Sequence, residues 1–160
     1  MTISATGRSR AGLTFIELLI IVIIIAVLSG LSLPKIKNTF DRLEFDSFLK
    51  DIYALCRYLQ ASAVTRGKIY CLNLNSENDP PEFFATFKLD QDFQKLPDRF
   101  GKVYKAPRGV TIVSLEPEGK KEIYFYPDAS IDSITMTFKS RADRQAALII
   151  KGTSGTIQIQ

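Results

Sequence analysis

The sequence predicts an α+β protein in which one long N-terminal helix precedes an antiparallel β-sheet domain of short strands. Two observations lead to this prediction. Apolar residues recur at helical spacing as far as Arg66-Gly67, whereas the residues after Gly67 alternate between apolar and polar in short runs. These runs follow one another every 8 to 12 residues or so, a spacing typical of antiparallel strands. The 160 residues are enough for one domain and a membrane segment.

Residues 1–12 are short, polar and mildly basic, and they are predicted to be a cytoplasmic leader outside the fold. Arg8 and Arg10 supply part of the net charge of +4, so the basic balance is weak evidence for nucleic-acid binding. An ordinary secretory signal and a plain uncleaved anchor are two alternatives. The helical pattern continues through the site where a secretory signal would be cut, which favours a retained segment.

An apolar run extends from Leu13 to Leu33, and Glu17 is its only charged residue. As a helix this run would be about 30 Å long, close to the thickness of the hydrocarbon core of a bilayer. Residues 13–34 are therefore predicted to be the transmembrane half of the helix. A carboxylate there costs about 2.5–3.5 kcal/mol, so Glu17 is either functional or solvated at headgroup level. Positive charges on both sides of the run leave its orientation undecided.

Residues 35–67 are predicted to form the amphipathic half of the same helix. Apolar side chains recur at mostly three- and four-residue spacing and draw one stripe: Ile36, Phe40, Leu43, Phe48, Ile52, Leu55, Leu59 and Ala63. Arg66-Gly67 is a favourable helix end, because a cation lies in the last turn and glycine can adopt a left-handed conformation. Pro34 lacks an N–H, which predicts a kink or, alternatively, a break between two separate helices.

Residues 68–160 are predicted to form a β-rich domain. Strands are expected at residues 69–75, 83–89, 110–115, 122–126, 134–138, 146–151 and 156–160. Residues 90–107 are expected to be irregular, because Pro97, Gly101 and Pro107 interrupt them.

The composition excludes several kinds of chemical site. The absence of His excludes a catalytic Cys–His pair, and two lone cysteines, Cys56 and Cys71, do not make a zinc site. The two cysteines are either a disulfide or two buried thiols. Two acidic clusters lack the pattern of a calcium-binding loop and are predicted to be solvated: Glu77/Asp79/Glu82 and Asp90/Asp92. No metal, cofactor or catalytic residue is therefore expected.

Two stretches resemble known proteins. Gly12-Leu13-Thr14-Phe15-Ile16-Glu17, with the apolar run and Pro34, resembles the type IV prepilin class, which includes type IV pilins and type II secretion pseudopilins. Residues 123–130, followed by two strands, a Gly152/Gly155 turn and a last strand, resemble the GspH/FimT group of minor pilin-like proteins. Leu13 stands where this class often has Phe or Met, and Ala129 stands where the group usually has a small residue or glycine.

The resemblance implies how the chain is processed. A membrane prepilin peptidase would cut between Gly12 and Leu13 on the cytoplasmic side and methylate the new amine of Leu13. The chain would then be a single-pass protein of the bacterial inner membrane, with residues 35–160 in the periplasm. The carboxylate of Glu17 would pair with that amine, on the same chain or a neighbour, and set the register between subunits.

The resemblance also implies a non-enzymatic filament subunit. The chain would be a minor pseudopilin of a type II secretion pseudopilus, resembling the H-type component. Its implied partners are the prepilin peptidase, other pseudopilins, the inner-membrane assembly platform and the lipid bilayer. A minor type IV pilin of pilus biogenesis or DNA uptake is the alternative, but the absence of Lys or Arg after Lys151 argues against DNA as a partner. A membrane-anchored enzyme is a further alternative, disfavoured because no nucleophile or metal constellation is present.

Overall fold

The computed structural model describes residues 14–152 and 154–160, with the side chains of 29–38 outside the description. The chain divides into two compact units, Met1–Lys37 and Asn38–Gln160. Helix α1, Phe15–Arg66, is 52 residues long and belongs to both units, which confirms the prediction of one long helix. The helix is continuous at Pro34, and the kink expected there stays a prediction.

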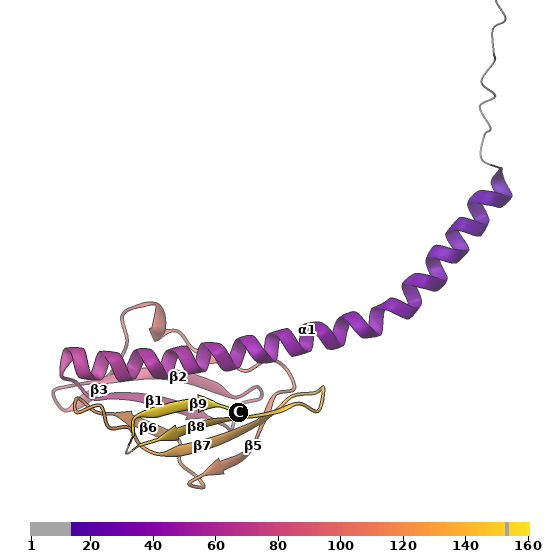
Figure 1. Ribbon diagram of the computed structural model, residues 1–160. Coiled ribbons are helices and arrows are strands. Elements are labelled where there is room, and N and C mark those ends of the chain that lie inside the picture. Colours follow the sequence, from indigo (N-terminus) through magenta and orange to yellow (C-terminus); the bar gives the residue numbers. More distant parts are fainter. Residues whose placement is uncertain (1–13, 153) are drawn as a thin grey trace, which may run out of the picture. The chain divides into compact units, whose positions relative to one another are not determined.

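The strands of the second unit form two antiparallel sheets (Figure 1). Sheet A has the order β3-β2-β1-β6, with β4 also paired to β2, and sheet B has the order β5-β7-β8-β9. The bounds are β1 Tyr70–Asn75, β2 Glu82–Leu89, β3 Asp92–Lys95, β4 Tyr104–Lys105, β5 Thr111–Glu116, β6 Glu122–Phe125, β7 Ile134–Lys139, β8 Gln145–Lys151 and β9 Thr156–Ile159. A short 3-10 helix, η1, covers Arg99–Gly101.

Every strand predicted from the alternating pattern is present, and its ends differ from the prediction by one residue at most. The expectation of an irregular 90–107 segment was wrong in part, since β3, η1 and β4 lie there. All residues of β3 are exposed, and β4 has only two residues. Neither strand therefore needs the apolar alternation by which a half-buried strand is recognised.

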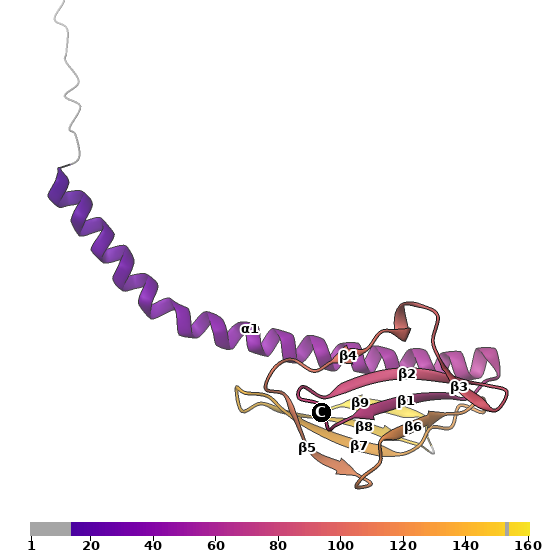
Figure 2. The same cartoon turned by 180° about the vertical axis from the view of Figure 1, so that it is seen from behind.

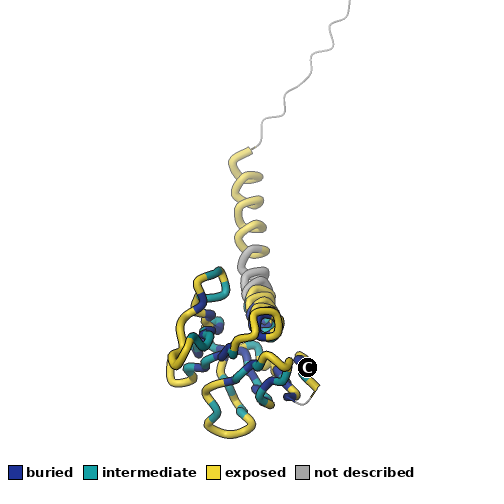
Figure 3. The backbone as a smooth tube through the Cα atoms, turned by 90° about the vertical axis from the view of Figure 1, so that its left-hand side faces the viewer, coloured by how far each residue is buried: buried dark blue, intermediate teal, exposed yellow. Residues whose placement is uncertain are grey.

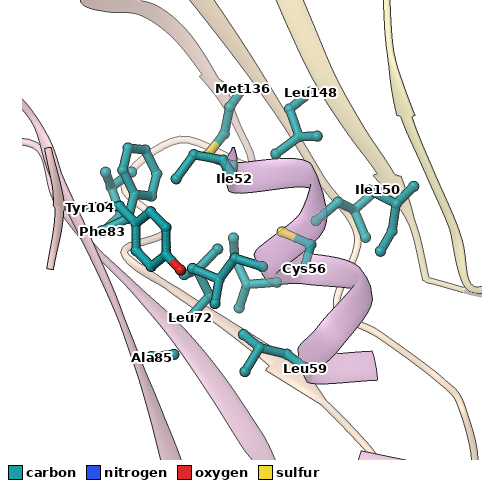
Figure 4. Close-up of a cluster of buried hydrophobic side chains, with 14 of the residues drawn as sticks. Ile52, Cys56, Leu59, Leu72, Phe83, Ala85, Tyr104, Met136, Leu148 and Ile150 are labelled. Atoms are coloured by element: carbon teal, nitrogen blue, oxygen red, sulfur yellow. The ribbon is translucent and has the colours of Figure 1, made fainter. Parts of the chain in front are cut away.

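The second part of α1 packs on both sheets, and the two opposite views agree on this arrangement (Figures 1 and 2). Side chains of Ile52, Cys56 and Leu59 enter a cluster with residues of both sheets (Figure 4): Leu72, Phe83 and Ala85 from sheet A, and Met136, Leu148 and Ile150 from sheet B. The ring centroid of Phe48 lies 5.9 Å from that of Phe83 and 5.7 Å from that of Phe138. One apolar core therefore joins the helix and both sheets.

Only the later part of the apolar stripe of α1 is buried. Phe40 and Leu43 are 61% and 59% exposed, whereas Phe45 is 1% exposed. In Figure 3 the buried residues gather in the second unit, whereas the residues of the first unit that are coloured are exposed. The apolar stripe predicted from the spacing is therefore buried only in its later part, and Phe40 and Leu43 lie outside the core. Periodicity shows that a face is apolar, but it does not show what covers that face.

Residues 96–107, called the η1 loop below, pack against one flank of α1. The ring of Tyr58 on α1 stacks on Phe100 with 3.9 Å between ring centroids. The Tyr58 hydroxyl donates a hydrogen bond to Asp98, which also accepts one from the Phe100 N–H at 2.9 Å. Leu96, the first residue of the loop, is 5% exposed. The loop is thus held to the helix by an aromatic stack and one polar anchor.

Candidate assembly surface

The part of α1 from Phe15 to Leu28 carries apolar side chains that are exposed on the surface of the chain. From Phe15 to Leu28 the large apolar residues are between 39% and 81% exposed. Exposed apolar surface on this scale marks a contact with a membrane or with another protein. In the part of the chain that the structure describes, no helix combines the length and apolarity needed to span a membrane.

Thr14 and Glu17 cap the start of α1 reciprocally. The Glu17 N–H donates to Thr14 Oγ1 at 3.3 Å, and the Thr14 N–H donates to Glu17 Oε2 at 3.5 Å. This is a capping box, in which each side chain satisfies a backbone donor that the helix leaves unpaired. Sequence reasoning did not identify it, although the spacing of Thr and Glu three residues apart is its known sign. Glu17 therefore has a local structural role.

The other predicted site residues of this region are described less fully. Gly12 and Leu13, the predicted cleavage and methylation site, lie outside the described residues. Pro34 lies within α1, and its side chain is outside the description.

A second exposed surface runs along α1 within the second unit. We call it the α1 seam, and its residues are spaced alternately by three and four: Phe40, Leu43, Ser47, Lys50, Ala54, Arg57, Ala61 and Val64. This is the heptad spacing by which one helix contacts another. Small residues at positions 47, 54 and 61 allow close backbone approach. The structure therefore shows two opposite sides of one helix, one buried in the core and one free.

Cys56 and Cys71 are both buried, and neither is part of a disulfide. Cys56 lies in the core cluster, whereas Cys71 alternates with Tyr70 and Leu72, which face that core. Cys71 therefore points to the opposite face of sheet A. Burial raises the pKa of each thiol to about 12, and the charge of Glu122 adds to the rise at Cys71. The structure therefore contains two buried thiols, and Cys56 and Cys71 do not form the alternative disulfide.

The acidic cluster at the β1–β2 turn is engaged by lysines. Glu77 pairs with Lys121 at 2.6 Å, and Glu82 pairs with Lys105 at 2.7 Å. Among the described residues, no group of three or more His, Cys, Asp or Glu is placed to hold a metal ion.

Comparison with solved structures supports the fold described above. No protein-family model matches the chain, and no curated protein matches it. A structure of the minor pseudopilin EpsH from the type 2 secretion system of Vibrio cholerae matches with a TM-score of 0.62 at 14% identity, over 73% of this chain and 96% of that chain. The type IV minor pilin FimU of Pseudomonas aeruginosa matches with a TM-score of 0.59 at 13% identity, over 74% of this chain and 90% of that chain. The chain therefore has the type IV pilin-like α+β fold that these minor pseudopilins and minor pilins share.

Proposed function

We propose that this chain is a minor pseudopilin, a non-enzymatic filament subunit of a type II secretion pseudopilus. The observation that carries the proposal is the exposed apolar stretch of α1 from Phe15 to Leu28, which one continuous helix joins to a domain with the fold of EpsH. A helix that is apolar on all sides requires cover from lipid or from other helices. A filament subunit receives both in turn, first in the inner membrane and then in the filament.

Processing at Gly12-Leu13 explains why a carboxylate begins this helix. Cleavage by a prepilin peptidase creates an α-amino group at Leu13, directly before Thr14. The carboxylate of Glu17 already bends back to the Thr14 N–H. An amine at Leu13 would therefore arise beside that carboxylate, or beside that of a neighbouring subunit. Pairing the two charges lowers the cost of burying either one in an apolar layer.

The α1 seam extends the packing surface beyond the first unit. We propose that helices of neighbouring pseudopilins pack along it, with their side chains against Ser47, Ala54 and Ala61. Phe40 and Leu43 would then be buried in the filament even though they are exposed in the single subunit.

A minor type IV pilin is the second candidate, and the likeness to FimU favours it. Deletion of the gene separates the two functions. A pseudopilin mutant retains folded exoproteins in the periplasm while pili remain, and a pilin mutant loses pili while secretion continues. Loss of pili alone would replace the secretion proposal with the pilin one.

The processing proposal is tested by N-terminal sequencing and intact mass of the membrane-extracted protein. We expect a chain that starts at Leu13 and carries one additional methyl group. A chain that starts near Leu33 would instead identify a secretory signal and would remove the basis of the filament proposal.

The role of Glu17 is tested by two substitutions. Glu17→Gln keeps a side chain that can close the capping box, whereas Glu17→Ala removes both the cap and the charge. If the charge sets register, both variants insert and are cleaved, but both co-assemble poorly with other pseudopilins in pull-down from membranes. Normal assembly of Glu17→Gln would show that Glu17 acts only as a helix cap.

A further inference from the structure

A groove of about 740 Å³ lies between the β1–β2 turn and strand β5. Its first wall consists of residues 76–79 and Pro81, and its second wall consists of the whole of β5 with Glu118. Figures 1 and 2 both show β5 as the strand of sheet B farthest from α1. The groove is therefore separate from the α1 seam.

One wall of the groove is an open sheet edge. Strand β5 pairs with β7 alone, and among the described residues its backbone makes no hydrogen bond outside that ladder. Free edges are commonly blunted by Lys, Pro or a β-bulge, and Thr111–Glu116 contains neither Lys nor Pro. A β-bulge lies between Ile112 and Ser114, after which Ser114–Glu116 pair regularly with β7. Val113 is 55% exposed at this edge. The edge thus offers backbone groups and an apolar contact to an added strand.

The groove is acidic. Four carboxylates line it, those of Glu77, Asp79, Glu116 and Glu118, and no Lys or Arg is among its lining residues. Lys121 Nζ lies 2.6 Å from Glu77 Oε1 and neutralises that carboxylate. The other three carboxylates remain for another partner.

The opposite wall is held in place before anything binds. The Asn78 side-chain amide donates to Glu82 at 3.0 Å, which ties the turn to the start of β2. The other end of the turn is held by Lys121. Its ammonium pairs with Glu77, and its carbonyl accepts a hydrogen bond of 2.7 Å from the Leu74 N–H. A preformed wall reduces the ordering cost of binding.

We propose that this groove binds an extended basic segment of a partner protein, which adds as a strand along β5. Backbone hydrogen bonds to the β5 edge would supply affinity. Lys or Arg side chains of the segment would face Asp79, Glu116 and Glu118 and supply selectivity. This inference goes beyond filament assembly and does not depend on it.

The test uses a fluorescent peptide of alternating Lys and Val with the full chain in detergent micelles. Anisotropy should show saturable binding that weakens as salt rises, because the contact is between opposite charges. Glu116→Lys/Glu118→Lys should weaken binding at least tenfold. Glu44→Lys/Asp92→Lys makes the same charge change at exposed sites outside the groove, and it should bind as the unchanged protein does. Equal loss in both variants would overturn the site.

A second peptide tests the strand addition itself. Methylation of alternate backbone nitrogens keeps every side chain and removes hydrogen-bond donors, so this peptide should bind at least tenfold more weakly. Equal binding of the two peptides would overturn the proposal, as would no binding at low salt. Light scattering without peptide covers one further outcome: self-association that the Glu116→Lys/Glu118→Lys variant abolishes would identify a second copy as the occupant and overturn the proposed partner.

Discussion

At the scale of single residues, burial of Cys56 and Cys71 couples stability to alkaline pH. Burial raises the pKa of both thiols from 9.0 to about 12. Above pH 9 the unfolded chain releases these protons while the folded chain retains them, so the unfolded state is favoured as pH rises. We expect the free energy of unfolding, measured by urea titration, to be unaffected by the thiols below pH 9 and to fall between pH 9 and 12.

The Cys56→Ala/Cys71→Ala variant is the control for this pH dependence. Tyrosines with raised pKa, including Tyr58, also lower stability at alkaline pH, and the variant retains their share. Its stability should therefore fall less steeply than that of the unchanged protein from pH 9 to 12. The same slope in both proteins would contradict the assignment to the thiols.

Residue identity alone predicted some roles at this scale and missed others. Glu17 stood out because a charge in an apolar run is costly, yet its reciprocal cap with Thr14 emerged only with the backbone geometry. The side of sheet A on which Cys71 lies depends on the register of β1, which the residue type does not contain.

At the scale of elements, the two sides of α1 predict opposite effects of one substitution. Leu59→Ala removes a side chain that is fully buried between α1 and the sheets, and it should cost about 2–5 kcal/mol of stability in urea unfolding. Leu43→Ala changes a side chain that is 59% exposed, and it should stay within about 0.5 kcal/mol. If the α1 seam packs neighbouring helices, only Leu43→Ala should impair co-assembly while leaving the fold intact. A large stability loss in Leu43→Ala would contradict the free side of α1.

The η1 loop gives a second prediction at this scale. A double-mutant cycle of Tyr58→Ala and Phe100→Ala should yield a coupling of about 0.5–1.5 kcal/mol, because the stacked rings contact each other directly. Hydrogen exchange of residues 96–107 should accelerate in each single variant. Additive effects of the two substitutions would show that the ring contact contributes no stability.

The sequence predicted the strands well for a physical reason. Strands β6, β7 and β8 are each buried on one face, and this burial imposes the alternation that marks them. The division into two sheets was not predicted, because alternation identifies a strand without identifying its neighbours. Phe40 and Leu43 were included in the apolar stripe because of their spacing, whereas the sheets cover α1 only from Phe45 onward.

At the scale of the whole molecule, a shared core predicts that both sheets unfold together. Leu72 of sheet A and Ile150 of sheet B are both packed in the cluster that α1 completes. Leu72→Ala and Ile150→Ala should therefore each lower a single melting transition, seen alike by far-UV and near-UV circular dichroism. Two separate transitions in either variant would show that the sheets are independent units.

The continuity of α1 also has a mechanical consequence. Helix α1 runs from the exposed apolar residues Phe15–Leu28 to the core residues as one element of 52 residues, with no loop within it. An axial force applied near Phe15 would therefore pass along a ladder of backbone hydrogen bonds and load the core directly, because no slack segment lies in between. Pro34 has no N–H and therefore contributes no hydrogen bond at its position. Under tension, helix α1 should yield first near Pro34.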